Sequence, residues 1–259
     1  MKRSFHRALD EAAAPLIAEI KPSSPKVGAL LATRTVDQIA RDYARAGAPC
    51  LSVTTGRWHQ GSLEMIAQMQ GAGLPILRKD FITSTAALEA SRDAGASAVL
   101  LTCKLIRRRD LLRLAEQALS RGLTPFVEAA TPEELDGLRL PEGAVLAVNN
   151  RDIAIRETDD GGVENSQALY DAARAAHAGS LISASGLLTP DCVHAARQTG
   201  FDGVLVGTAL LSGPQPAFET TRDFIAAAKY KTQKKRHSRE HTQTSTAGGR
   251  RNHRDIQHV

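Results

Sequence analysis

Charged and amide side chains stand at the ends of several short apolar runs in this sequence. The set comprises Glu19, Lys21, Lys79, Glu128, Asn149 and Arg151. Lysines and carboxylates that share a desolvated site can have their pKa values pushed apart, which suits proton transfer near neutral pH. A purely structural salt-bridge network is the alternative use of such a set. We favour acid–base chemistry because every member ends a run of the same kind.

Eight apolar runs of strand length alternate with segments of helical periodicity, which predicts eight βα units. The helical segments carry apolar residues at i, i+3 and i+4, and several end at Gly, as helices commonly do. Eight such units in about 210 residues predict an α/β fold of the (β/α)8 TIM barrel class. An open doubly wound sheet is the alternative, but no G-x-G-x-x-G follows the first run. The runs are 16–21, 48–55, 74–80, 97–102, 123–128, 144–149, 180–185 and 201–207.

In such a barrel the active site lies at the carboxyl ends of the strands, where these polar residues are expected. Alternation along the first run puts Glu19 and Lys21 on one face and Ala18 and Ile20 on the other. The apolar pair suits the layer of helices, so we expect Glu19 and Lys21 to point into the barrel mouth. Lys79 is expected to reach the same mouth from the third run.

Glycines follow the last two runs, in the pairs Ser185-Gly186 and Gly207-Thr208. The loops after the seventh and eighth strands of many barrels bind phosphate through backbone N–H groups, and glycine permits the close approach. Ordinary turns are the alternative. Ser24, in the serine- and proline-rich loop after the first run, adds a hydroxyl donor or a rigid turn. We therefore expect a small phosphorylated substrate.

The net charge of +5, from 33 Lys and Arg against 28 Asp and Glu, is unevenly distributed. Residues 229–259 hold nine basic and two acidic residues, a net charge of +7, which leaves −2 for residues 1–228. We predict one barrel domain over 1–228 and a basic tail over 229–259. The tail has too few apolar residues to offset its ordering entropy, so we expect it to be disordered. A solvated extension is favoured over a nucleic-acid contact, which stays an alternative.

Composition argues against several other classes of protein. No run of about 18 apolar residues predicts a membrane span, and the first 15 residues lack the apolar stretch of a signal peptide. The three cysteines (Cys50, Cys103 and Cys192) are odd in number and show no C-x-x-C spacing, which argues against a disulfide framework. We expect a cytoplasmic protein without a metal site. The histidines are expected to be surface or packing residues: His6, His59, His177 and His194.

The ordered motifs at the run ends resemble the indole-3-glycerol-phosphate synthase family of tryptophan biosynthesis. The resemblance covers about residues 16–212, and each motif falls at the end of a different predicted strand. The matching segments are IAEIKPSSPKVG (17–28), GSLE (61–64), PILRKDFI (75–82), PFVEA (125–129), VNNRDI (148–153), SASGL (183–187) and GVLVGTALL (203–211).

The resemblance implies a carbon–carbon lyase without metal or organic cofactor. The family converts 1-(2-carboxyphenylamino)-1-deoxyribulose 5-phosphate to indole-3-glycerol phosphate, CO₂ and water. By motif, Lys79 is similar to the general acid of ring closure, Glu128 to the carboxylate of dehydration, and Lys21 to the lysine that contacts the substrate carboxylate. Glu19 and Asn149 would orient these groups beside Arg151. The resemblance assigns the phosphate to Ser24, Ser185, Gly186, Gly207 and Thr208.

Two segments depart from the family pattern. Ala184 stands where the family has Glu in S-E-S-G, and Thr55 replaces the acidic residue that usually follows Thr54. In the second segment Trp58, the only tryptophan, is expected to pack either on a substrate ring or under its own loop. Two other functions therefore stay open: a barrel that has lost catalysis and binds a ligand or RNA, and a related sugar-phosphate isomerase. The isomerase would need a Cys/Asp pair, whereas the first run ends in Glu and Lys.

Overall fold

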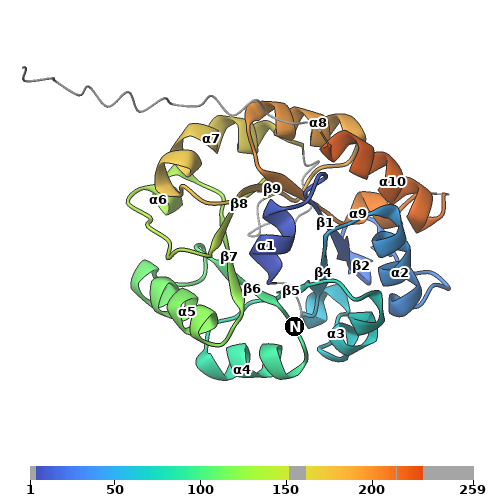
Figure 1. The fold of residues 1–259 in the computed structure, drawn as a ribbon, viewed down its shortest axis with the longest axis horizontal. Helices are drawn as coiled ribbons and strands as arrows, with labels where there is room; N and C mark the ends of the chain where they lie inside the picture. Colours follow the sequence, from blue (N-terminus) through green and yellow to red (C-terminus); the bar gives the residue numbers. More distant parts are fainter. Residues whose placement is uncertain (1–3, 152–161, 214, 230–259) are drawn as a thin grey trace, which may run out of the picture.

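Eight parallel strands close into a barrel, as the sequence predicts (Figure 1). The structure is a computed structural model that describes residues 4–151, 162–213 and 215–229. Hydrogen-bonded neighbours follow the order β1-β10-β9-β8-β7-β6-β5-β4, and β4 pairs with β1 to close the ring. The barrel strands are β1 (Leu16–Ile20), β4 (Cys50–Thr54), β5 (Ile76–Lys79), β6 (Ala98–Thr102), β7 (Thr124–Ala129), β8 (Val145–Asn149), β9 (Leu181–Ala184) and β10 (Gly203–Val206).

Helices form a layer outside the strands and occupy the segments predicted for them (Figure 1). Thr35 and Gln38 make a capping box at the start of α2, and Thr131 and Thr189 cap α6 and α8 before an N1 proline. These helices are α2 (Val36–Ala46), α3 (Glu64–Gln68) with η2 (Met69–Ala72), α4 (Thr85–Asp93), α5 (Arg108–Ser120), α6 (Pro132–Leu135), α7 (Glu164–Ala176), α8 (Pro190–Thr199) and α10 (Ala217–Ala228).

Several short elements were not predicted. They are α1 (Phe5–Asp10), the two-stranded β2 (Ser23–Ser24) and β3 (Gly28–Ala29), η1 (Arg57–His59) and α9 (Thr208–Leu211). Each has six residues or fewer, too short for a hydrophobic period to identify it. Three of these segments lie in loops that follow β1, β4 and β10, so they shape the carboxyl end of the barrel.

The two faces of each strand divide as predicted from alternation. Ile17 and Leu77 belong to the cluster inside the barrel, whereas Ala18 and Ile20 pack in a cluster with residues of the outer helices. The interior cluster below the carboxyl ends of the strands consists of apolar residues. Glu19, Lys21 and Lys79 continue the inward-facing rows, so they come together at the carboxyl end.

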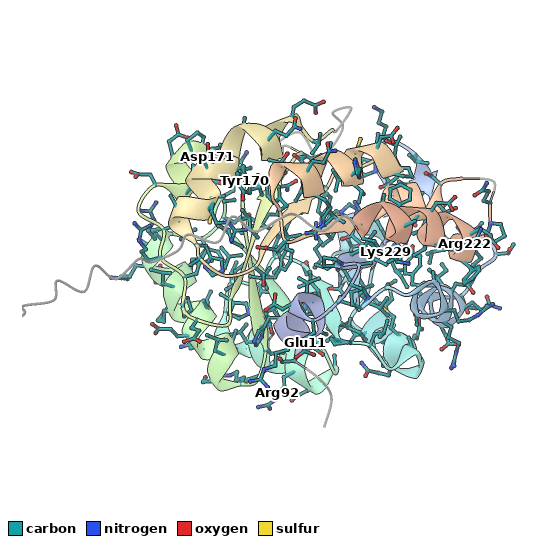
Figure 2. All side chains as sticks on the ribbon, turned by 45° about the horizontal axis from the view of Figure 1, so that its top comes forward. Glu11, Arg92, Tyr170, Asp171, Arg222 and Lys229 are labelled. Carbon is teal, nitrogen blue, oxygen red and sulfur yellow. The ribbon has the colours of Figure 1, made fainter. Side chains whose placement is uncertain are left out.

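Helix α1 closes the amino end of the barrel. In Figure 1 it lies across the middle of the ring of strands, and in Figure 2 Glu11, just after it, lies within the ring of helices. Phe5 and Leu9 belong to the interior cluster, and the Phe5 ring meets the edge of Phe126 at 6.4 Å. The Cys50 thiol, at the start of β4, donates to the Phe5 carbonyl oxygen. The interior of the barrel is therefore covered at its amino end.

The outer surface is made of polar helical faces. Figure 2 shows Asp171 on α7 and Arg222 on α10, both on the outer layer of helices. No helix within the described residues is long and apolar enough to span a membrane. Those residues likewise contain no cluster of His, Cys, Asp and Glu that could hold a metal ion. Of the predicted tail, residues 230–259 lie outside the described part of the chain, as does Asp152 of the VNNRDI motif.

Candidate active site

Two lysines converge on one carboxylate at the barrel mouth. Lys21 Nζ lies 3.8 Å from Glu19 Oε1, and Lys79 Nζ lies 3.9 Å from Glu19 Oε2. Lys21 is 4% exposed, Lys79 is 8% exposed and Glu19 is 3% exposed. The buried hydroxyl of Ser52, on β4, donates to Glu19 Oε2 at 3.3 Å. Charges this deeply buried are costly unless paired, and here one carboxylate is shared by both ammonium groups.

A second carboxylate faces this group from β7. Asn149 Nδ2, at the end of β8, donates to Glu128 Oε1 at 2.9 Å, and the Arg151 backbone N–H donates to Asn149 Oδ1 at 2.9 Å. Glu128, Asn149 and Arg151 are all buried. The amide of Asn149 thus orients the carboxylate and the backbone leading to Arg151. The structure brings all six predicted acid–base and polar residues to one end of the barrel.

A depression of about 330 Å³ opens beside Glu19 and Lys21. Arg151 and the two predicted glycine loops line it, with Ser185 and Gly186 on one side and Gly207 and Thr208 on the other. These residues were predicted to bind phosphate, and the structure brings them together.

The backbone of the two loops has unusual features beside the first depression. Ser185 has φ of +63° and Gly186 has φ of +69°, and a left-handed serine is strained. The Asn150 amide group donates to the carbonyl oxygens of Ala184 and Ser185 and holds that loop. At Gly207 a Cβ atom would lie 2.6 Å from Glu19 Oε1, so a larger residue there would displace the carboxylate.

A second depression, of about 320 Å³, is lined by Lys79 and Glu128. Trp58 and Phe81 form its outer wall as stacked rings with centroids 5.8 Å apart and planes 9° from parallel. Both rings are about two-fifths exposed, and Leu100 adds an apolar surface. His59 also lines it. Of the surface and packing roles expected for this histidine the structure shows packing, because the ring is buried with Nδ1 3.0 Å from the Ser23 carbonyl oxygen.

An ionic cluster at the edge of the second depression holds the strand end that carries Lys79. Arg78 Nη2 lies 3.1 Å from Asp80 Oδ2, and the Thr55 hydroxyl donates to the same oxygen at 2.8 Å. Arg78 also donates from Nε to Thr55 Oγ1 and from Nη1 to Ser91. Through these hydrogen bonds Thr55, which follows β4, links that strand to Arg78 and Asp80 at the end of β5.

Three singled-out residues lie apart from the central group. Ser24 is buried in β2 and lines neither depression. Ala184 packs its methyl group in the interior cluster, so β9 contributes no carboxylate there. The Cys103 thiol, after β6, has its pKa raised to about 12, first by burial and then by Glu134 and Glu128. That high pKa argues against a nucleophilic role.

Two polar residues of β4 that face the barrel interior were not predicted from the sequence. Ser52 and Thr54 share the inward face with the buried Cys50, and Thr54 lines the second depression. The sequence held a signal for them, because period-2 alternation from an apolar Cys50 places all three on one face. His59 and Phe81 lie in loops, where no periodicity indicates direction.

Comparison with known proteins identifies the family. The family model described as indole-3-glycerol phosphate synthase matches residues 1–222. The chain belongs to this family. Synthases of this name from Thermococcus kodakarensis and Pyrococcus furiosus are 38% and 36% identical to it over 204 and 215 residues. The first alignment covers 78% of this chain and 88% of the relative, and the second covers 82% and 92%.

Solved structures show the same fold at much lower sequence similarity. Tryptophan synthase from M. tuberculosis matches with a TM-score of 0.61 and 15% identity, covering 87% of this chain and 96% of that chain. A thiamine phosphate pyrophosphorylase from Pyrococcus furiosus matches with a TM-score of 0.56 and 12% identity, over 86% and 98%. These similarities support the barrel fold of the chain and carry no information on its chemistry.

Proposed function

We propose that the chain is an indole-3-glycerol-phosphate synthase, a carbon–carbon lyase of tryptophan biosynthesis. It converts 1-(2-carboxyphenylamino)-1-deoxyribulose 5-phosphate to indole-3-glycerol phosphate with release of one CO₂ and one water. Family membership supports this reaction. The observation that carries it in the structure is the convergence of Lys21 and Lys79 on Glu19, between two depressions of different character.

The two depressions give the substrate a direction. The first is lined by Arg151 and the loops at Ser185 and Gly207, which suit the phosphate. The second has aromatic and apolar walls, which suit the anilino ring. The sugar chain then crosses between Glu19 and Glu128. Ser24 would reach the phosphate only through a change in the loop after β1, since it lines neither depression.

Ring closure is the step assigned to Lys79. The ring carbon that bears the carboxylate forms a bond to the C2′ carbonyl carbon, and the carbonyl oxygen takes a proton from Lys79 Nζ. Glu19 keeps this ammonium and that of Lys21 in place, at 3.9 Å and 3.8 Å. The positive charge near the developing alkoxide stabilises it more strongly in a buried mouth than in water.

The later steps use Glu128. The bond to the carboxylate breaks, CO₂ leaves, and its electron pair restores the aromatic ring. The new hydroxyl then leaves as water with a proton from a lysine, while Glu128 takes the proton lost from C1′. Asn149 holds Glu128 Oε1 at 2.9 Å, which leaves the orientation of the carboxylate defined for this transfer.

The direct test is incubation of the purified protein with the carboxyphenylamino-deoxyribulose phosphate while indole fluorescence is followed. We expect steady formation of indole-3-glycerol phosphate without added metal. A folded protein that binds the substrate and gives no product at high enzyme concentration would instead indicate a binding barrel, since Ala184 leaves β9 without a carboxylate. In that event Ala184→Glu is the first variant to assay.

A further inference from the structure

Thr54 is a buried polar residue of the mouth that the proposed chemistry does not use. It is the last residue of β4 and is 1% exposed. Its Oγ1 has no hydrogen-bond partner among the described residues. A buried hydroxyl without a partner costs free energy, so a protein that keeps one in its active site implies a polar group that arrives with the ligand.

The register of the barrel places Thr54 between the two lysines. Thr54 pairs in register with Lys79 of β5, on one side. On the other side Ile20 of β1 pairs with Val53, so Lys21 follows at the level of Thr54. Glu19, which pairs in register with Ser52, lies one layer below and binds both ammonium groups. The backbone of Thr54 therefore lies at the same height in the barrel as those of the two lysines, on the strand between theirs.

The surroundings of Thr54 match the ring end of the substrate. It lines the second depression with Lys79, Glu128 and the aromatic wall of Trp58 and Phe81. The loop after β4 folds back on it, because a Cβ atom at Gly61 would lie 2.0 Å from the Thr54 carbonyl oxygen. This contact fixes the backbone of Thr54 and so the direction of its side chain.

We propose that Thr54 Oγ1 donates a hydrogen bond to the ring carboxylate of the substrate, between Lys21 and Lys79. The inference rests on the proposed function, since it takes the carboxyphenylamino group as the occupant of the second depression. A carboxylate fits here because it can accept from a hydroxyl and from two flanking ammonium groups at once. Thr54 thereby becomes a residue that selects carboxylated substrate over decarboxylated product.

The experiment measures how Thr54→Val affects binding of two matched ligands. The first is 1-(2-carboxyphenylamino)-1-deoxyribitol 5-phosphate, which keeps the carboxylate and lacks the carbonyl needed for cyclisation. The second is the 1-phenylamino compound, which differs only in the missing carboxylate. We expect Thr54→Val to weaken the first by about ten-fold and the second by less than about two-fold, because only the first loses a hydrogen bond to a charged group.

Two further variants separate this effect from a structural one. Thr54→Ser keeps the hydroxyl and should recover most of the affinity for the carboxylated ligand. Thr124→Val makes the same change in a buried threonine at the amino end of β7, and both affinities should stay unchanged. If Thr54→Val does not fold, Thr54→Ala provides the same comparison.

Equal weakening of both ligands by Thr54→Val, or no weakening of either, would overturn the inference while leaving the proposed function intact. Failure of the proposed function gives a different result: the wild-type protein would not form indole-3-glycerol phosphate from the ketone substrate. The inference falls with it in that case. Wild-type turnover is therefore measured first, in the same preparation used for binding.

Discussion

Lys21 and Lys79 come from strands that are not neighbours, since β4 lies between β1 and β5. Glu19 reaches both ammonium groups from one layer below. This arrangement lets one side chain be replaced without leaving Glu19 as an isolated buried charge. Residue-scale tests of catalysis can therefore be made here with less risk of unfolding than at most buried ion pairs.

At this scale we predict that Lys79→Met and Glu128→Gln fail at different steps. Lys79→Met should lower the rates of CO₂ release and of indole formation together, by about 10²- to 10⁴-fold, because the acid of ring closure is missing. Glu128→Gln should release CO₂ in a single turnover faster than indole appears. Rapid-quench measurement of both products checks this. Lys229→Met, on the exposed end of α10, is the control.

Simultaneous loss of both products in Glu128→Gln would contradict the assignment of Glu128 to the dehydration step. Unchanged rates in Lys79→Met would contradict the assignment of ring closure to Lys79. In either case far-ultraviolet circular dichroism must first show a wild-type fold.

At the scale of elements, the neighbours of Lys79 on β5 hold its side chain in the mouth. Arg78 precedes Lys79, and the Arg78 side chain enters the cluster with Asp80, Thr55 and Ser91. Because the side chains of a strand alternate, holding Arg78 outside keeps Lys79 inside. The loop that follows then presents Phe81 to Trp58.

Asp80→Asn should therefore reduce both stability and catalysis. We expect the free energy of unfolding to fall by about 1–3 kcal/mol, because hydrogen bonds to a partly buried charged group are lost. We also expect a lower kcat, since the change adjoins Lys79. Urea denaturation and steady-state assays measure the two effects. Asp93→Asn, which breaks an exposed pair with Arg92, should cost less than about 1 kcal/mol and spare kcat.

A histidine at the end of α7 predicts a pH dependence of stability. Burial lowers the pKa of His177 from its ordinary value of 6.5, and its Nε2 lies 3.1 Å from the Ala144 carbonyl oxygen. The unfolded chain then binds more protons than the folded chain just below pH 6.5, so stability falls as the pH falls through that region.

Urea denaturation at pH 7.5 and pH 5.0 measures this contribution. His177→Gln removes the titrating group and should show a smaller loss of stability between the two pH values than wild type. An equal loss in both proteins would show that His177 does not contribute.

Sequence reasoning predicted the eight strands because each is an apolar run that ends in a polar or glycine residue. It failed at short elements outside the eight βα units, such as α1 and β2, which lack the apolar runs and helical spacing that indicated the others. The six charged and amide residues of the mouth were predictable from alternation and strand position. Alternation from Cys50 also indicated the inward face for Thr54, although no role was predicted for it, whereas His59 lies in a loop where no period indicates direction.

For the whole molecule, charge is divided unevenly along the sequence. Residues 1–228 carry a net charge of −2, and residues 229–259 carry +7. The positive groups that face the substrate are therefore a few placed side chains of the mouth. The described residues that line the two depressions all lie between 19 and 209.

Truncation after Lys229 should accordingly leave kcat/KM for the proposed substrate unchanged. Retention on immobilised heparin or single-stranded nucleic acid should be lost, because that binding depends on the number of basic residues. The assay and a salt-gradient elution measure the two properties. A fall in kcat/KM on truncation would show that the tail contributes to the active site.

The ratio of CO₂ to indole-3-glycerol phosphate tests the proposed function most directly. Purified wild-type protein is incubated with 1-(2-carboxyphenylamino)-1-deoxyribulose 5-phosphate, and CO₂ and indole-3-glycerol phosphate are quantified together by mass spectrometry. We predict one CO₂ released for each indole-3-glycerol phosphate formed, with many turnovers for each protein molecule. A folded, substrate-saturated protein that releases neither product would contradict the account.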